Sequence, residues 1–317
     1  MEKNKKKIDK AIVRIIVFLL VTFVVTYAIE IGVIMPMAGS TDVESQAMAY
    51  KLISFCMLFP MSAMFITRVV TMEGLTDMYF VPKDFRRTWK YYLLAWLCPS
   101  ILIIVGMMVY FIVVPGSYDP NMGYYYMALG EAGADIPLEE LQIIAVINIV
   151  ISFIMAPIVN IANCIGEEWG WRGYLLPKCL EKMSVLPTVI ITGVIWGLWH
   201  APLTCIGHNY GMDYPGFPYL GIFAMCMFCI VFGIFLSYVT IRTKSCLPAA
   251  IAHAAMNGVA SAGLLFTATG GNPFVGPAPT GIIGGIGFVV AAIVIAVILV
   301  KEEKANKMQT NDLEIMN

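Results

Sequence analysis

Two adjacent carboxylates stand beside an arginine in the segment Glu167–Tyr174, which reads EEWGWRGY. On a helix, Glu168 and Arg172 lie one turn apart and can form an ion pair. Glu167 points about 100° away and keeps its carboxylate unpaired on that face. A fixed carboxylate beside a free one suits general acid–base chemistry. The alternative is an acidic pair at the membrane surface, with Arg172 as its cytoplasmic anchor.

The chain has three histidines, and two of them fall inside long apolar segments. His200 follows Trp196 by one helical turn, so the indole could fix the imidazole rotamer, although a helix-end histidine bonded to a carbonyl is the plainer alternative. His253 and Asn257 are also one turn apart, on a helix rich in alanine and glycine. Because small residues let helices approach closely in lipid, this pair is expected to face the bundle interior. It could belong to a site or only join two helices.

These polar groups come from three separate apolar segments and could meet at one site. A charged side chain at the centre of a membrane helix costs about 2.5–3.5 kcal/mol on insertion scales, and such residues usually have a function. Two carboxylates, an arginine, two histidines and an asparagine can bind one metal ion or activate one water molecule. The combination therefore favours a shared function over three unrelated structural pairs.

The composition indicates the surroundings of such a site. Hydrophobic residues make up 59% of the 317 residues and charged residues 13%, which excludes an ordinary soluble enzyme. The net charge of −1 gives no bulk attraction to nucleic acid. The eight cysteines lie mostly in or beside apolar runs and are expected to be buried thiols. The chain is therefore predicted to be an integral membrane protein.

Hydropathy predicts an all-α bundle of about eight membrane-spanning helices. The expected spans are Ala11–Met35, Ala47–Val70, Tyr91–Val114, Leu141–Cys164, Leu186–Leu203, Tyr219–Ile241, Leu247–Phe266 and Gly281–Val300. With this count, all 20 lysines and arginines except Lys51 fall on one side of the membrane. The positive-inside rule makes that side cytoplasmic, so both termini are predicted to be cytoplasmic. Glu30 lies near the outer end of the first span, where an interfacial carboxylate is expected.

Three parts of the chain are expected. Residues 1–140 hold the first three spans and an outer loop, residues 141–266 hold spans four to seven with the polar motifs, and residues 267–317 hold the last span and a cytoplasmic tail. The middle part contains a conflict. Glu167 falls at the cytoplasmic end of span four, whereas His200 lies about 24 Å of helix into span five. The segment Glu167–Leu180 must therefore dip into the bilayer, or span five must start deeper or tilt, with Pro157, Pro177 and Pro187 as places to bend.

The three motifs together resemble those of the CPBP family of intramembrane proteases, which includes type II CAAX prenyl endopeptidases and bacteriocin-processing or immunity-like proteins. The motifs are EExxxR followed by Gly-Tyr, an aromatic residue four positions before His200, and HxxxN, and they cover about Asn163–Asn257. Trp196 stands where the family often has phenylalanine. The resemblance implies a helical bundle of about eight spans in a membrane, here expected to be a bacterial plasma membrane.

The resemblance also implies roles for individual residues. Glu167 would be the general base, and His200 would help to hold and activate the water. His253 and Asn257 would stabilise the oxyanion. Glu168, Arg172 and Trp196 would support the site.

The sequence does not decide whether the implied reaction depends on a metal ion. Glu167, His200 and His253 could be three zinc ligands with one position left free, so a divalent metal such as zinc is one reading. However, the chain has no HExxH motif, and Asn257 is a poor zinc ligand but a good oxyanion donor. Water activation without a metal is therefore slightly favoured.

The implied activity is that of an endopeptidase acting on a prenylated CAAX-type, hydrophobic or leader peptide, with the lipid bilayer as its other partner. A non-catalytic immunity or binding protein of the same family is the alternative. A proton-coupled transporter is a third class, but spans one to three carry almost no acidic residue beyond Glu30. The clustering of polar residues on three helices favours a site over a proton path.

Overall fold

The protein is all-helical, as the sequence predicts. A computed structural model describes residues 9–131, 133 and 136–316, with side chains described as far as residue 309. The lysines at positions 3, 5, 6 and 7, which contribute to the predicted charge asymmetry, lie outside the described residues. Within the described part, the only β-type pairings are two isolated bridges, Tyr118 to Thr267 and Asn272 to Gly276.

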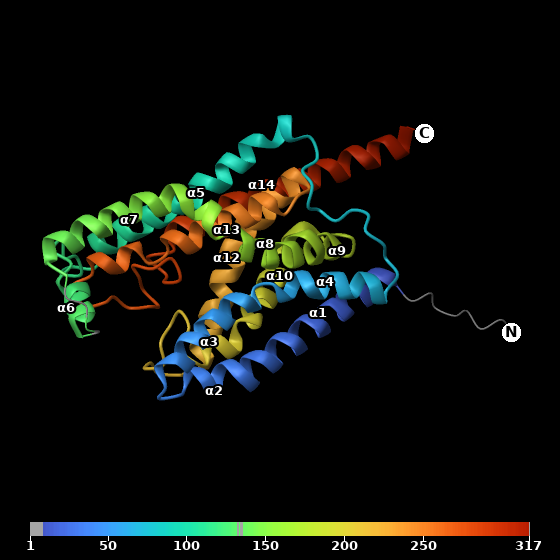
Figure 1. The fold of residues 1–317 in the computed structure, drawn as a ribbon. Coiled ribbons are helices and arrows are strands. Elements are labelled where there is room, and N and C mark those ends of the chain that lie inside the picture. The colour runs from blue at the N-terminus through green and yellow to red at the C-terminus, as the bar shows by residue number, and fades with distance from the viewer. Residues whose placement is uncertain (1–8, 132, 134–135, 317) are drawn as a thin grey trace.

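The N-terminal third forms a long first helix, a broken pair and a second long helix (Figure 1). Helix α1 (Lys10–Ile29) begins at Asp9, whose side chain accepts a hydrogen bond from the Ala11 amide, as an N-cap should. It continues through a π-helical turn η1 (Glu30–Ile34) into α2 (Met35–Ala38). Helices α3 (Val43–Cys56) and α4 (Phe59–Val70) meet at an angle of 44°. Helices α5 (Phe85–Val113) and α6 (Gly123–Glu131) follow.

The polar motifs lie on the helices of the middle part. Helix α7 (Leu138–Val159) leads into a helical run made of α8 (Ile161–Gly170), the π-helical η2 (Trp171–Leu175) and α9 (Leu176–Leu180). Helix α10 (Val185–Trp199) and the short α11 (Ala201–Thr204) come next. The chain then forms α12 (Tyr219–Thr243), α13 (Leu247–Val259), the 3₁₀ turn η3 (Ala262–Phe266) and α14 (Ile286–Met316).

This helical run places Glu167 differently from the end of the predicted fourth span. The predicted span ends at Cys164, but helical structure continues through Glu167 as far as Leu180. Glu167 is therefore in the interior of a helical run and not at its end. The segment after Glu167 stays inside the bundle, which is what the first of the two alternatives requires, and its depth in the bilayer stays a prediction.

Membrane crossing is supported for five helical runs of the described chain, which are long and apolar enough to span a bilayer. They are Lys10–Ala38, Phe85–Val113, Leu138–Val159, Tyr219–Thr243 and Leu247–Phe266. The bent pair α3 and α4 would make a sixth. Helix α10 is apolar but has only 15 residues, and the apolar part of α14 ends at Lys301. The eight predicted segments are thus largely helical, whereas a count of eight spans is not confirmed.

Two close helix contacts hold the middle of the bundle together. A Cβ atom on Gly193 would lie 2.6 Å from the Cα of Ile230, so the α10 backbone touches that of α12. A Cβ atom on Gly166 would lie 2.6 Å from the carbonyl oxygen of Met57, so α8 touches the break between α3 and α4. Glycine at these positions brings the helices that carry the polar motifs as near to their neighbours as backbone allows.

Candidate active site

The ion pair of Glu168 and Arg172 lies at the centre of the buried polar cluster. The Nη1 atom of Arg172 is 3.0 Å from both carboxylate oxygens of Glu168, as one-turn spacing predicts. The Nδ1 atom of His253 lies 2.9 Å from the Oε1 atom of Glu168. The three residues are at most 4% exposed, so this contact joins α8 to α13 entirely inside the protein. Since a carboxylate only accepts, Nδ1 of His253 carries a proton.

Glu167 is held differently from its neighbour. The indole Nε1–H of Trp196 donates to its Oε2 atom at 2.8 Å, which links α8 to α10. The guanidinium carbon of Arg172 lies 4.2 Å from the centre of the Trp196 ring. Trp196 therefore contacts both Glu167 and the arginine of the ion pair. Sequence spacing placed Trp196 beside His200 only, because a contact between two helices leaves no periodic signal in either one.

His200 stands at the end of α10, where its ring lies against two tryptophans. The Nδ1 atom is 2.9 Å from the carbonyl oxygen of Trp196, which is the carbonyl-bonded arrangement considered from sequence. Because that oxygen can only accept, Nδ1 carries the proton and Nε2 keeps a lone pair. The Trp199 ring lies 4.8 Å from the imidazole and donates to the Thr26 hydroxyl of α1 at 2.9 Å. The bond to the carbonyl thus fixes a tautomer and leaves Nε2 able to accept from water.

A cavity of about 420 Å³ brings the predicted residues together. Glu167, His200, His253 and Asn257 all line it, while Glu168 and Arg172 do not. Asn257 is exposed to this space, and the one hydrogen bond recorded for its side chain is a weak one to the Cys164 sulfur at 3.8 Å. The cavity therefore combines a carboxylate, two imidazoles and an amide with apolar walls, which is typical of a ligand site.

The donor atoms that could hold a metal differ from the predicted set. Ligand atoms of Glu167, Glu168 and His253 lie within 4.8 Å of one another, and His200 does not belong to this group in the described chain. Such a buried Glu-Glu-His cluster could bind a divalent ion. However, Glu168 is already paired with Arg172 and His253, and a metal on that carboxylate would have to compete with the guanidinium. The observed hydrogen bonds fit a metal at Glu168 poorly.

One buried carboxylate of the first helix could not be assigned from sequence. Glu30 was expected at the membrane interface, but it is fully buried in the π-helical turn η1. Among the described residues, neither of its carboxylate oxygens has a hydrogen-bond partner. The signal that could have found it is the acidic residue inside an apolar span, since π-turns and buried charges are frequent at functional positions.

The fold and the cavity define an integral membrane protein with carboxylate, imidazole and amide side chains in a cavity among its helices. Residues 146–259 match the sequence model of a family described as type II CAAX prenyl endopeptidase Rce1-like. Over 44 residues the chain is 39% identical to CAAX prenyl protease 2 of Methanococcus maripaludis. That stretch is 14% of this chain and 16% of the relative. Through this segment, the chain is similar to the CAAX prenyl proteases, and it matches only a small part of the length of this relative.

A second family model covers the last helices. Residues 218–309 match the ABC 3 transport family, and this stretch overlaps the first match over 218–259. It contains α12, α13 and the apolar part of α14 but leaves out Glu167, Glu168, Arg172 and His200. The protease match contains all of these residues together with His253 and Asn257.

Proposed function

We propose that this chain is an intramembrane endopeptidase that hydrolyses a peptide bond in a prenylated, hydrophobic or leader peptide. The observation that carries the proposal is that two neighbouring carboxylates are paired differently. Glu168 is tied to Arg172 and His253, whereas Glu167 faces the cavity and is held by the Trp196 indole. A carboxylate that is positioned but free of a cationic partner can accept a proton from water.

The proposed reaction begins with water between Glu167 and His200. Glu167 accepts one proton of the water, and the lone pair on Nε2 of His200 accepts a hydrogen bond from it. The water oxygen attacks the peptide carbonyl and forms a tetrahedral oxyanion. When this intermediate collapses, the C–N bond breaks and Glu167 passes its proton to the leaving amine. Atoms balance with one water consumed, one carboxylate product and one amine product.

His253 and Asn257 are proposed to stabilise the oxyanion. The Asn257 amide can donate directly, since its recorded contact to sulfur is weak. His253 already donates from Nδ1 to Glu168, so it needs a second proton on Nε2 to act as a donor. The Glu168 carboxylate beside it is the group that balances the resulting charge. This explains a buried carboxylate that touches the histidine but does not line the cavity. No metal is required by this scheme.

We also propose the membrane arrangement that the charge pattern predicts. The chain crosses the membrane eight times with both termini in the cytoplasm, and α10 and the apolar part of α14 serve as short crossings. Residues 141–266 form the catalytic core, flanked by residues 1–140 and 267–317. The location is a bacterial plasma membrane, where lipid and a peptide or protein substrate are the partners.

Peptide cleavage by the purified protein in lipid nanodiscs tests this function. Glu167→Gln keeps the size of the side chain and an oxygen for the Trp196 indole, so it is expected to fold. General base catalysis contributes about 10²–10⁴-fold, and the variant is expected to lose activity by that factor. Glu73→Gln, which removes a carboxylate outside the cavity, is the matched control and is expected to cleave normally.

The substrates are a prenylated-tail peptide and a panel of hydrophobic leader peptides, each with and without a chelator. Activity that survives the chelator and is lost in Glu167→Gln supports the metal-free scheme. Loss with the chelator would overturn it in favour of a metalloprotease. Unchanged cleavage by Glu167→Gln would overturn the role of Glu167. Absence of cleavage by the folded wild type would favour the immunity or binding alternative.

A further inference from the structure

The cavity lies at one end of the helices that form it. It is lined by residues at or just beyond the ends of α10 and α13, such as His200, Asn209, Asn257 and Ser261. Phe228 contributes from the first half of α12. Other parts of the wall come from α3, α8, α11, η3 and residues 278–280 before α14. Of the described residues that line the cavity, none is lysine or arginine.

The opposite ends of the same helices carry the positive charge. Lys182 precedes α10, Lys244 lies between α12 and α13, and Lys301 follows the apolar part of α14. We call this the basic end, and it lies toward the side of α9 and the end of α14 in Figure 1. From Leu247 to Asn257 the helix rises about 15 Å, and from Val185 to His200 about 22 Å. The cavity residues are therefore far from the basic end along both helices.

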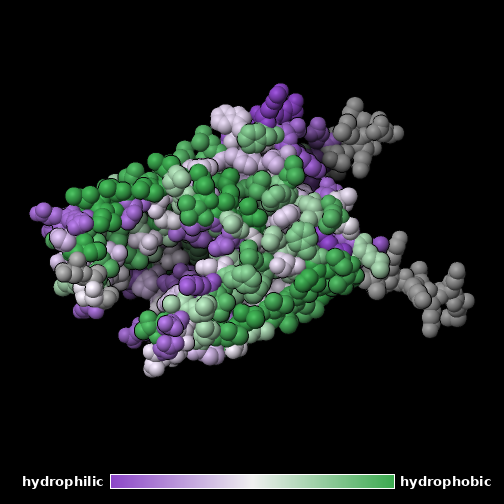
Figure 2. All heavy atoms as spheres, in the orientation of Figure 1, coloured by the Kyte–Doolittle hydropathy of each residue, from purple (hydrophilic) through white to green (hydrophobic). Residues whose placement is uncertain are grey.

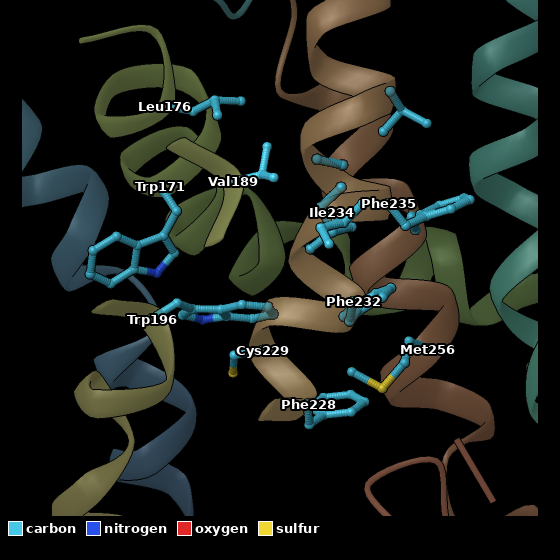
Figure 3. Close-up of a cluster of buried hydrophobic side chains, with 14 of the residues drawn as sticks. Trp171, Leu176, Val189, Trp196, Phe228, Cys229, Phe232, Ile234, Phe235 and Met256 are labelled. Atoms are coloured by element: carbon cyan, nitrogen blue, oxygen red, sulfur yellow. The ribbon is translucent and has the colours of Figure 1, made fainter. Parts of the chain in front are cut away.

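A buried aromatic layer separates the cavity from the basic end. Trp171, Trp196 and Phe232 are at most 1% exposed, and Arg172 packs on the Trp196 ring. Figure 3 shows Phe228 and Met256, which line the cavity, on one side of this layer. Leu176, Val189, Ile234 and Phe235 lie on the other side of it. In Figure 2 the surface is hollowed between the lobe of α5, α6 and α7 and the lobe of α2 and α3, away from the basic end.

We infer that the scissile peptide enters the cavity from the face opposite the basic end, which the positive-inside rule makes the non-cytoplasmic face. The inference rests on the proposed function for its substrate and on the proposed topology for the name of the face. The position of the entrance favours some of the proposed substrates, which are prenylated, hydrophobic and leader peptides, over others. A hydrophobic or leader-type segment presented at the outer leaflet can reach Glu167, whereas a tail anchored in the inner leaflet cannot.

The cavity walls fit such a segment. The apolar residues that line the cavity include Met57, Leu203, Met225, Phe228 and Met256. Methionine side chains are flexible and polarizable, so they adapt to apolar groups of different shape. The walls thus suit an extended hydrophobic peptide, with its carbonyl directed to the histidines and the asparagine.

Cysteine accessibility in intact cells tests the entrance without relying on activity. Ser261→Cys places a thiol on an exposed position of the cavity, and Lys83→Cys places one on the pocket at the basic end. A membrane-impermeant maleimide that adds mass reports each as an extra adduct over the unsubstituted protein, which has eight native cysteines. Ser261→Cys is expected to react in intact cells and Lys83→Cys only after permeabilisation. The reverse pattern would overturn the inference.

Cleavage from each side of the membrane separates this inference from the proposed function. A membrane-impermeant hydrophobic leader peptide is given to intact cells and to inverted membrane vesicles, each with wild type and Glu167→Gln. Cleavage by intact wild-type cells alone, absent in the variant, is expected. Cleavage only by inverted vesicles would overturn the entrance and leave the protease intact. Outer labelling of Ser261→Cys without cleavage from either side would instead overturn the protease and leave the entrance.

Discussion

Two ionic clusters on the same helical run differ in how their charges are matched. At the basic end, Glu73 contacts Lys178 at 2.7 Å and Arg14 at 3.5 Å, and it accepts from the Tyr174 hydroxyl at 2.8 Å. In the buried cluster beside the cavity, Arg172 and His253 both contact Glu168. The first cluster has surplus cations and partial exposure. The second is buried and lies next to a surplus carboxylate, Glu167, which lines the cavity.

This difference distinguishes an ion cluster that only joins helices from one that also leaves a group free for a reaction. Glu73 ties α1, the segment after α4 and α9 together, and nothing in that cluster is left unpaired for a substrate. Glu168 also ties two helices, but its pairing leaves the adjacent carboxylate directed into a cavity. An ion pair therefore marks a site when a neighbouring charged group of the same sign is left without a cationic partner.

The largest difference between the clusters is expected in stability. Arg172→Met leaves Glu168 buried without its guanidinium, and breaking a buried pair costs about 3–5 kcal/mol. Arg14→Met removes a cation from a partly exposed cluster that keeps Lys178, so a loss of about 0–1 kcal/mol is expected. Unfolding in mixed micelles, followed by far-ultraviolet circular dichroism, measures both.

A double variant sharpens this prediction. Glu168→Gln combined with Arg172→Met removes both charges of the pair, so it is expected to be more stable than Arg172→Met alone. Equal losses for Arg172→Met and Arg14→Met would show that the two clusters do not differ in burial as described.

The next difference lies inside the cavity, between two asparagines. Asn257→Ala removes the proposed oxyanion donor, and loss of one such donor lowers kcat about 10²–10³-fold. Asn209 also lines the cavity and also has a weak bond to sulfur, at 3.5 Å to Met225. Asn209→Ala is therefore the matched control, with kcat expected to stay near the wild-type value. Single-turnover cleavage measures both, and equal losses would contradict a special role for Asn257.

Helix spacing predicted the local part of the site. The pairing of Glu168 with Arg172 and the nearness of Trp196 to His200 follow from one-turn neighbours on a helix, and both are observed. The bonds from Trp196 to Glu167 and from His253 to Glu168 could not be predicted. They depend on the angles and offsets at which α8, α10 and α13 pack, and no short stretch of sequence encodes these.

Hydropathy predicted the helices better than their ends. The all-helical fold follows from long apolar runs, and each expected span is largely helical, although the last one becomes helical only at Ile286. The end placed at Cys164 does not match the helices, because α7 ends at Val159 and the next helical run, from Ile161 to Leu180, includes the paired Glu168 and Arg172. Glu30 was expected at the interface and is buried within the protein. An acidic residue in an apolar span is visible in the sequence, but the packing that buries it is not.

The smallest predicted effect concerns pH at the basic end. Burial raises the pKa of Glu73, but hydrogen bonds from Lys178 and Tyr174 and the charges of Lys178 and Arg68 outweigh it, so the pKa lies below the ordinary value of 4.5. A carboxyl with a lowered pKa stabilises the fold above its unfolded-state pKa, and this contribution is lost as the pH falls through the lowered value. Wild type is expected to exceed Glu73→Gln in stability by less than about 1 kcal/mol near pH 7. The difference in stability between the two proteins should narrow below about pH 4.5.

Thermal unfolding of both proteins across this pH range measures the difference, and the shared loss from other carboxylates cancels in it. A difference in stability that stays constant with pH would show that Glu73 holds the helices through its shape and hydrogen bonds and not through its charge. The two clusters would then differ only in the unpaired carboxylate of Glu167.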